Sequence, residues 1–173
     1  MSGVLLETDR LRLRPWRVSD AAVQLQLWRE RDPRVPPHRR ISPDGHPTLE
    51  ELEERIRSQP TPETIGLLGA EHAASGRVIG YCGLIPNAYG RDGEPEIAYE
   101  FLQETWGHGY ATEAARAVVG WATATGYARL WATVREWNLA SRRVLAKLGF
   151  VETGETEPED GCGVSLFTMN ELR

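Results

Sequence analysis

The sequence predicts an α/β fold of the α+β kind, in which helices pack on a mixed sheet. Short segments with strand patterns are separated by four segments with helical spacing, and a glycine-rich turn joins a strand to a helix in the second half of the chain. The chain has 173 residues, a length that suits one domain with a hydrophobic core and leaves no room for a second full domain. We therefore expect a single domain over residues 1–173.

The composition favours a cytoplasmic protein that binds neither nucleic acid nor membranes. The formal net charge is −5, whereas nucleic-acid binders hold phosphates with surplus lysine and arginine. The first residues lack the basic and apolar regions of a signal peptide, and no later stretch is apolar enough to cross a bilayer. Cys82 and Cys162 are too few for a disulfide framework. Residues 29–40 contain five arginines, and this segment is either a solvated loop or a place where an acidic acceptor docks.

The first predicted elements are a strand and a helix. Residues 11–15 alternate leucine with arginine before a proline, the period of two that is typical of a half-buried strand. Ser19 is a candidate N-cap for the next helix, whose apolar face includes Leu25 and Trp28. Three prolines within residues 33–37 require that helix to end before them.

A second helix and three strands follow. Thr48 and Glu51 have the spacing of a capping box, which predicts a helix that starts there. Residues 65–71 and 77–85 are rich in apolar and β-branched residues around a short turn, and we expect them to form a hairpin. Residues 96–102 supply the next strand of this run.

The second half of the chain alternates helix and strand. A helix is predicted over 111–125, with Gly126 as its C-terminal stop, and its apolar side takes Ala114, Ala115, Val118 and Ala122. Residues 130–134 are short, apolar and unbroken, as in a buried strand.

The chain closes with a helix and a strand pair. Asn138 is a strong N-cap, and the helix after it is expected to bury Ala140, Val144 and Leu148. Residues 150–156 and 164–169 then form the last two strands around a polar turn.

The stretch from Trp106 to Ala111 carries the strongest chemical signal. Gly107 and Gly109 allow the backbone to turn several N–H groups toward one point, and the helix behind them adds the positive end of its dipole. A pyrophosphate group would be held there without a lysine. The sequence lacks both the Lys-Ser/Thr ending of a P-loop and the three spaced glycines of a dinucleotide fingerprint, so nucleotide hydrolysis and hydride transfer are not indicated.

Four segments in order, residues 7–15, 96–99, 106–114 and 138–150, resemble the GNAT superfamily of N-acetyltransferases, and within it the RimJ/RimL-like branch. The resemblance spans nearly the whole chain. It implies a mixed, mostly antiparallel twisted sheet of six to seven strands with helices on both faces. It also implies an acetyl-CoA-dependent N-acetyltransferase, with acetyl-CoA as co-substrate, and this branch often forms homodimers.

The resemblance further implies which residues contact the coenzyme. Phe101 and Leu102 would pair through their backbone with the pantetheine arm, and Asn138 would fix the arm further along. Trp106 replaces the usual arginine or glutamine of the loop and would pack instead of contacting phosphate. The residues implied to hold the pyrophosphate are Gly107, His108, Gly109, Tyr110, Ala111 and Thr112.

An acceptor amine must lose a proton before it attacks a thioester, because an alkyl ammonium has a pKa of about 10.4. Side chains alternate along a strand, so Glu96 and Glu100 share one face and Tyr99 points to the other. The backbone separation of Glu96 and Glu100, about 13 Å, is too long for a coupled carboxylate pair. Glu96 lies where related acetyltransferases place a general base, and we prefer it to Glu100, which stays the alternative.

The departing coenzyme thiolate needs a hydrogen-bond donor. Many relatives supply a tyrosine seven residues after the motif asparagine, and here that residue is Leu145. Ser141 is then the expected donor, because it follows Asn138 by one helical turn and is common in this branch. We expect Trp28 and Tyr99 to line the acceptor pocket, Trp28 beside the basic loop.

The acceptor class stays open between the α-amino group of a protein N-terminus and an amine on a small molecule, because this fold hosts many acceptors. The loss of the tyrosine also leaves an alternative function, a non-catalytic acyl-CoA-binding sensor or interaction module. No metal is expected. The histidines are scattered, at residues 38, 46, 72 and 108, and no two of them have the spacing that a zinc site uses.

Overall fold

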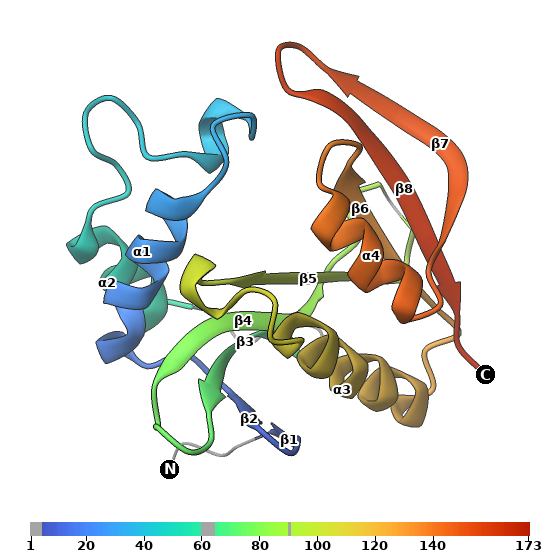
Figure 1. Cartoon of the computed structure of the whole chain (residues 1–173), viewed down its shortest axis with the longest axis horizontal. Coiled ribbons are helices and arrows are strands. Elements are labelled where there is room, and N and C mark those ends of the chain that lie inside the picture. The colour runs from blue at the N-terminus through green and yellow to red at the C-terminus, as the bar shows by residue number, and fades with distance from the viewer. Residues whose placement is uncertain (1–4, 60–64, 90) are drawn as a thin grey trace.

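A computed structural model describes residues 5–59, 65–89 and 91–173, and its described strands form one sheet of eight (Figure 1). The order across the sheet is β1-β2-β3-β4-β5-β6-β8-β7. The strands are β1 (Leu6–Glu7), β2 (Leu11–Arg14), β3 (Gly66–His72), β4 (Val78–Ile85), β5 (Glu96–Phe101), β6 (Arg129–Arg135), β7 (Val151–Glu159) and β8 (Gly163–Glu171). The predicted mixed fold is confirmed, and the predicted count of six to seven strands was too low because the two-residue β1 is too short to show a periodic pattern.

Within the described residues, four α-helices cover the sheet: α1 (Ala21–Glu30), α2 (Leu49–Arg57), α3 (Tyr110–Thr125) and α4 (Leu139–Lys147). The capping box predicted for α2 is present, since Thr48 Oγ1 accepts from Glu51 N at 3.2 Å and Glu51 accepts from Thr48 N at 2.7 Å. Gly126 ends α3 in the left-handed conformation, as expected. None of the helices in the described ranges is long and apolar enough to cross a membrane.

The central pair of the sheet is incomplete. All described neighbours pair antiparallel except β5 and β6, which are parallel and share a single register pair, Glu96 with Trp131. On its other side β5 pairs with β4 along six residues, from Glu96 to Phe101. The backbone of β5 beyond Glu96 therefore has no partner strand on the β6 side, and the two halves of the sheet part there (Figure 1).

The core lies between α3 and the sheet. Four small side chains of α3 are fully buried, as the sequence predicted, and small residues let a helix lie close to the strands below it: Ala114, Ala115, Val118 and Ala122. They belong to one cluster with Leu11, Leu13 and Ile97 from the strands. This packing fixes the start of α3 relative to β5.

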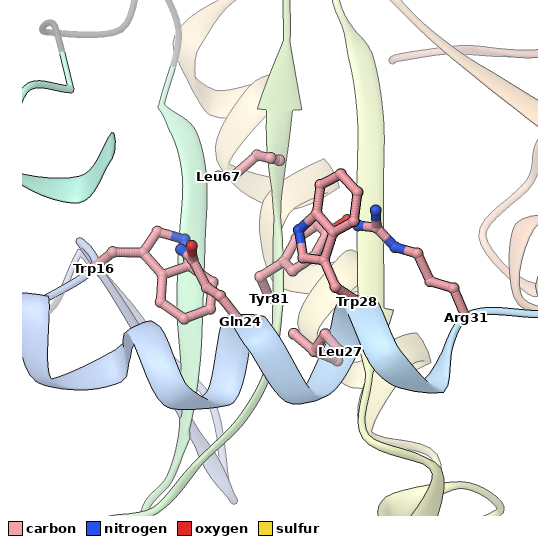
Figure 2. A pocket seen from close by; sticks show the side chains of 7 residues that line it. All are labelled: Trp16, Gln24, Leu27, Trp28, Arg31, Leu67 and Tyr81. Carbon is pink, nitrogen blue, oxygen red and sulfur yellow. The ribbon is translucent and has the colours of Figure 1, made fainter. Parts of the chain in front are cut away.

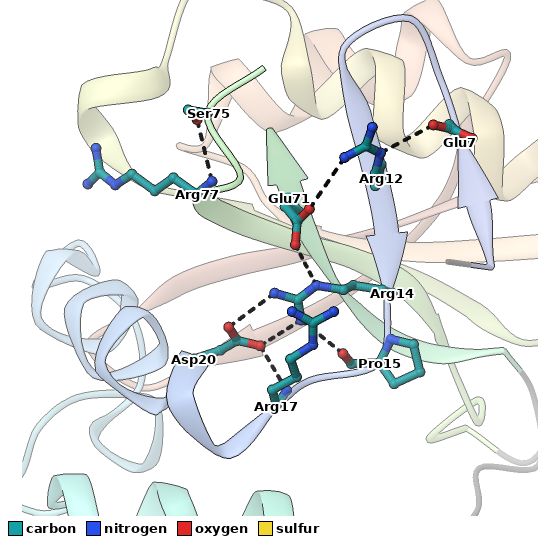
Figure 3. Close-up of polar contacts among 9 residues, drawn as sticks. All are labelled: Glu7, Arg12, Arg14, Pro15, Arg17, Asp20, Glu71, Ser75 and Arg77. Carbon is teal, nitrogen blue, oxygen red and sulfur yellow. Dashed lines mark hydrogen bonds and ion pairs between the residues drawn. The ribbon is translucent and has the colours of Figure 1, made fainter. Parts of the chain in front are cut away.

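A buried ion-pair network fixes α1 on the other face of the sheet (Figure 3). Arg14 on β2 is 3% exposed and bonds Asp20 at 2.8 Å and Glu71 at 2.7 Å, and the hydrogen bond to Asp20 is the main cause that raises the Arg14 pKa. The prediction that Ser19 caps α1 was wrong. The N-cap is Asp20, and its carboxylate accepts from Arg14 and from Arg17 N instead of capping the helix.

The prediction for the buried face of α4 was also wrong in part. Ala140 is exposed, and Leu145, at 3% exposure, is the buried residue of the helix. Asn138 caps α4 as expected, with its side chain accepting from Ser141 N at 3.1 Å. This orientation turns the side of α4 that carries Ser141 and Leu145 toward β5 and the core.

Candidate active site

The predicted phosphate-binding loop lies between β5 and α3 and has the backbone that its glycines allow. Gly107 and Gly109 have φ values of 78° and 81°, a region that side chains other than glycine rarely adopt. Gly109 is the N-cap residue of α3, which starts at Tyr110, one residue before the predicted start. Residues 106–109 are exposed and Tyr110 and Ala111 are half-buried, and the first N–H groups of a helix have no partner within it.

Three side chains hold this loop from outside. Arg10, which precedes β2, donates through Nε to Glu113 on α3 at 2.7 Å and through Nη1 to the carbonyl of His108 at 2.9 Å. Thr8 Oγ1 donates to the same Glu113 carboxylate at 2.6 Å. Burial raises the pKa of Glu113, but the hydrogen bonds from Thr8 and Arg10 outweigh burial and hold the pKa below its ordinary value. The carboxylate is therefore charged at neutral pH and keeps both donors.

Two aromatic side chains of the loop make their contacts within the chain. Trp106 is 61% exposed, and its indole N–H donates to the carbonyl of Phe101 at 2.8 Å. His108 stacks on Tyr110 with ring centroids 5.8 Å apart, and its Nδ1 lies 3.0 Å from the carbonyl of Trp106. Both side chains shape the turn.

The backbone of β5 alternates between groups that bond to β4 and groups that face the other way. Leu102 donates its N–H to Ile79 of β4 at 2.9 Å, and its carbonyl accepts from Thr105 N at 2.9 Å. Both backbone groups of Leu102 thus bond within the chain, and its pairing with the coenzyme arm stays a prediction. Because backbone groups alternate in an antiparallel pair, those of Tyr99 and Phe101 face the side where β5 parts from β6.

Glu96 lies at the point where β5 and β6 part. It is 8% exposed, and its Oε2 accepts a hydrogen bond from Thr133 Oγ1 on β6 at 3.3 Å. Burial raises the pKa of the Glu96 carboxyl, and the hydrogen bonds from Thr133 and from the backbone of Ala88, with the charge of Arg91, offset only part of that rise. Glu96 thus combines burial with weak pairing, and its pKa lies above the ordinary value of a carboxyl.

Glu100 is on the same face but in a different environment. Arg31 from the end of α1 holds its carboxylate with two bonds of 2.8 and 2.9 Å, and Tyr81 donates to it at 3.0 Å. Burial alone would lower the pKa of Arg31, yet its pairing with Glu100 raises the pKa, so the guanidinium stays charged. The Glu100 carboxylate is thus occupied by donors from two neighbouring residues.

Arg31 and Tyr81, the two residues that bond Glu100, line a pocket of about 150 Å³ between α1 and the sheet (Figure 2). Its lining is aromatic and aliphatic with two polar side chains: Trp16, Gln24, Leu27, Trp28, Arg31, Leu67 and Tyr81. Arg31 lies 4.1 Å above the ring of Trp28. Trp28 therefore lines this pocket, and its contact with an acceptor stays a prediction.

Tyr99 does not line this pocket, although the sequence led us to expect it beside Trp28. Its side chain points to the opposite face of the sheet, and its Oη lies 2.9 Å from Ser141 Oγ on α4. The alternation of side chains along β5, with Glu100 on the face of α1, requires this placement. Ser141 and Tyr99 thus meet across the parting of β5 and β6.

Sequence reasoning did not assign roles to Arg10, Thr8 or Glu113. The three residues lie inside segments 7–15 and 106–114, which carried the resemblance, but Arg10 and Glu113 are 103 residues apart and no spacing rule joins them. In the described part of the chain, no group of three or more His, Cys, Asp or Glu side chains is arranged to hold a metal ion.

Comparisons with known proteins find relatives that match most of this chain. The uncharacterized protein YkkB of Bacillus subtilis is 32% identical over 145 residues, which make up 83% of this chain and 83% of that protein. The uncharacterized N-acetyltransferase p20 of Bacillus licheniformis is 29% identical over 161 residues, 86% of this chain and 83% of that protein. A variant of a spermidine N-acetyltransferase from Vibrio cholerae has the same fold, with a TM-score of 0.74, 19% identity and coverage of 95% of each chain.

The family itself follows from a match to a domain model. The model of the acetyltransferase (GNAT) domain covers residues 10–151, which include the glycine loop, Glu96 and Ser141. The chain therefore belongs to the GNAT acetyltransferase family and is an N-acetyltransferase.

Proposed function

We propose that this enzyme transfers the acetyl group of acetyl-CoA to a primary amine, by direct attack of the amine on the thioester. The acceptor is the α-amino group of a protein N-terminus or an amine on a small molecule. The observation that carries the proposal is the weakly paired, buried carboxylate of Glu96 on the strand that leads into the glycine loop. The four matching segments support placement in the RimJ/RimL-like branch, with one catalytic domain over residues 1–173.

The loop fits the diphosphate of the coenzyme. Positive φ at Gly107 and Gly109 turns successive N–H groups in one direction, and the start of α3 contributes its dipole. The side of β5 at Tyr99 and Phe101 has no partner strand in the described residues and suits an extended arm that carries amide groups, because such an arm can pair like a strand. The carbonyl of Phe101 accepts from the indole of Trp106, so Tyr99 and the N–H of Phe101 are the groups proposed for this pairing. Asn138 at the start of α4 lies on the far side of this parting and is suited to fix the arm.

Glu96 is proposed to accept the proton of the acceptor ammonium, directly or through a water molecule. The free amine then attacks the carbonyl carbon of the thioester. The C–N bond forms, the nitrogen loses its second proton to solvent, the C–S bond breaks, and the sulfur leaves with the electron pair as a thiolate. Backbone N–H groups of β5 are suited to polarise the thioester carbonyl, and Ser141 is proposed to donate a hydrogen bond to the sulfur.

The acceptor is proposed to enter on the face of the sheet where Glu96 lies. The pocket around Trp28 is on that face and offers an apolar seat beside the fixed charges of Arg31 and Glu100. Glu100 is proposed to have a structural role beside this pocket, where it orients Arg31. Its carboxylate already has three donors from two residues.

We expect Arg10→Ala to weaken coenzyme binding without changing the chemical step. The variant loses the bonds to Glu113 and to the carbonyl of His108 that hold the loop in shape. Because Arg10 is partly exposed, the loss is modest, and the KM for acetyl-CoA should rise about three- to tenfold with kcat unchanged. Steady-state kinetics with varied coenzyme measures this.

Arg12→Ala is the matched control, because Arg12 is exposed to a similar extent and pairs with Glu7 and Glu71, away from the loop. An equal rise in KM for both variants would mean that Arg10 acts through general charge and not through the loop.

The proposed function is tested by incubation with acetyl-CoA and a panel of amines, followed by measurement of free thiol. The panel contains peptides with free N-termini, polyamines and aminoglycosides. Thiol release that depends on one of these amines is the expected result. Release with peptides above the other classes would place the acceptor at a protein N-terminus.

Calorimetry with acetyl-CoA distinguishes the alternative. Coenzyme binding without thiol release from any amine would favour a non-catalytic acyl-CoA sensor. The loss of the tyrosine at Leu145 is the observation that favours this second candidate.

A further inference from the structure

In many relatives a tyrosine on the helix that corresponds to α4 donates a hydrogen bond to the departing thiolate. The residue at that position in this chain, Leu145, cannot do so. Leu145 is 3% exposed and belongs to the core cluster with Ala114 and Phe150. It has no polar atom, and its burial leaves no route by which it could face a ligand. A donor for the departing thiolate must come from another position.

Another residue, Tyr99, contacts the same helix, α4, from the sheet. Tyr99 is on β5, and its hydroxyl lies 2.9 Å from Ser141 Oγ and 3.2 Å from the carbonyl of Ser141. This contact spans the region where β5 and β6 have no ladder, so it is a side-chain bridge across the proposed seat of the coenzyme arm. Tyr99 and Ser141 are 42 residues apart in the chain.

We infer that Tyr99 is a positioning residue that acts through Ser141: its phenol donates to Ser141 Oγ and leaves the serine hydrogen free for the coenzyme sulfur. This inference rests on the proposed function. It assigns to a phenol on β5 the role of supporting the leaving group, in place of the absent tyrosine on α4.

The direction of the hydrogen bond follows from acidity. A phenol, with an ordinary pKa near 10, is a much stronger donor than an alkyl hydroxyl, which is the better acceptor. The carbonyl of Ser141 is the weaker competitor, because its contact is longer and a helix carbonyl has its usual partner four residues further on. Burial raises the pKa of Tyr99, so the phenol stays protonated and able to donate through the neutral range.

The step balances without proton transfer from Tyr99. The C–S bond breaks and the sulfur keeps the electron pair. Ser141 stabilises the resulting negative charge by donating a hydrogen bond, and that bond strengthens when Ser141 Oγ itself accepts from Tyr99. The thiolate takes its proton from solvent after it is released.

Tyr99→Phe tests the inference because it removes only the hydroxyl and keeps the ring. The expected result is a fall in kcat of about fivefold, the effect of one hydrogen bond, with the KM for acetyl-CoA unchanged. In a Ser141→Ala background the same substitution should change kcat by less than about twofold, because the two residues act as one unit. A merely structural tie between β5 and α4 would lower the thermal midpoint and raise KM instead.

A second readout needs no acceptor. Free coenzyme A is bound to the protein at one fixed pH, and the ultraviolet absorbance of its thiolate is measured against the unbound protein. The bound thiolate fraction should fall about fivefold in Tyr99→Phe. Tyr127→Phe is the control, because Tyr127 packs on Trp121 at the far end of α3 and should leave both readouts unchanged.

The outcomes separate the two proposals. Thiol release by the wild type with no amine of the panel would overturn the proposed function, and this inference with it. Normal turnover by the wild type, with the same kcat and thiolate fraction in Tyr99→Phe, would overturn only the role of Tyr99.

Discussion

Glu96→Gln is expected to lower kcat by about a hundredfold to ten-thousandfold, the usual contribution of a general base. The amide has the size of the carboxylate but accepts no proton, so the acceptor stays an ammonium. Burial raises the pKa of Glu96, and activity of the wild type should therefore increase with pH as this carboxyl loses its proton. The variant should lose this rise in the pH profile. Thiol release with saturating substrates measures both effects.

The same substitution should preserve or increase stability. A carboxyl whose pKa is raised in the folded state stabilises the fold only at low pH, and this contribution is lost as the pH rises through the raised value. At neutral pH the buried charge costs stability, and glutamine removes that cost. A thermal midpoint equal to or above that of the wild type is expected.

Glu100→Gln is the comparison, because it lies on the same face of the same strand. It should lower the thermal midpoint, since it breaks a part-buried pair with Arg31, and should reduce kcat far less than Glu96→Gln does. A greater loss of kcat in Glu100→Gln than in Glu96→Gln would move the base to Glu100.

Gly109→Val should weaken acetyl-CoA binding by at least about tenfold, because a β-branched residue at a φ of 81° costs more than about 1–2 kcal/mol. The nearest atom to an added Cβ is Arg10 Nη2 at 3.6 Å, so space is sufficient and the cost comes from the backbone. The loop must leave the conformation that gathers its N–H groups at the start of α3. Calorimetric titration with acetyl-CoA gives the affinity.

Gly120→Ala on the same helix is the control. An added Cβ at Gly120 meets no atom within 4 Å, and alanine in a helix interior stabilises by about 0.5–1 kcal/mol over glycine. This variant should melt later and bind acetyl-CoA as the wild type does. Unchanged affinity in Gly109→Val would contradict a main-chain site for the diphosphate.

Local rules sufficed where one short segment determined the outcome. The capping box of Thr48 and Glu51 fixed the start of α2, and Gly126 fixed the end of α3. The rule failed for Ser19 because Asp20, its neighbour, is held by Arg14 in a buried network that involves a distant strand. A propensity for capping cannot show that competition.

The candidate site was predictable in its parts and not in its connections. The alternation along β5 placed Glu96 and Glu100 on one face, but only the structure shows that Arg31 holds Glu100 while Glu96 is nearly unpaired. The bond of Tyr99 to Ser141 joins segments 42 residues apart, and no periodic pattern encodes it. The side of β5 without a partner strand could not be predicted from the sequence either, because it depends on where β6 diverges from β5.

The single pairing between β5 and β6 gives the sheet an internal edge. An outer edge with unpaired N–H and C=O groups recruits strands from other chains and invites aggregation. Here the backbone groups of Tyr99 and the N–H of Phe101 lie in the middle of the sheet, between halves that α3 and α4 help to flank, while the carbonyl of Phe101 accepts from the indole of Trp106. A narrow extended ligand can reach these backbone groups. A second polypeptide strand carries side chains on both faces, and these would clash with the flanking elements. The fold thereby leaves backbone hydrogen-bonding groups open to a small ligand and keeps them from pairing with a strand of another copy of the chain.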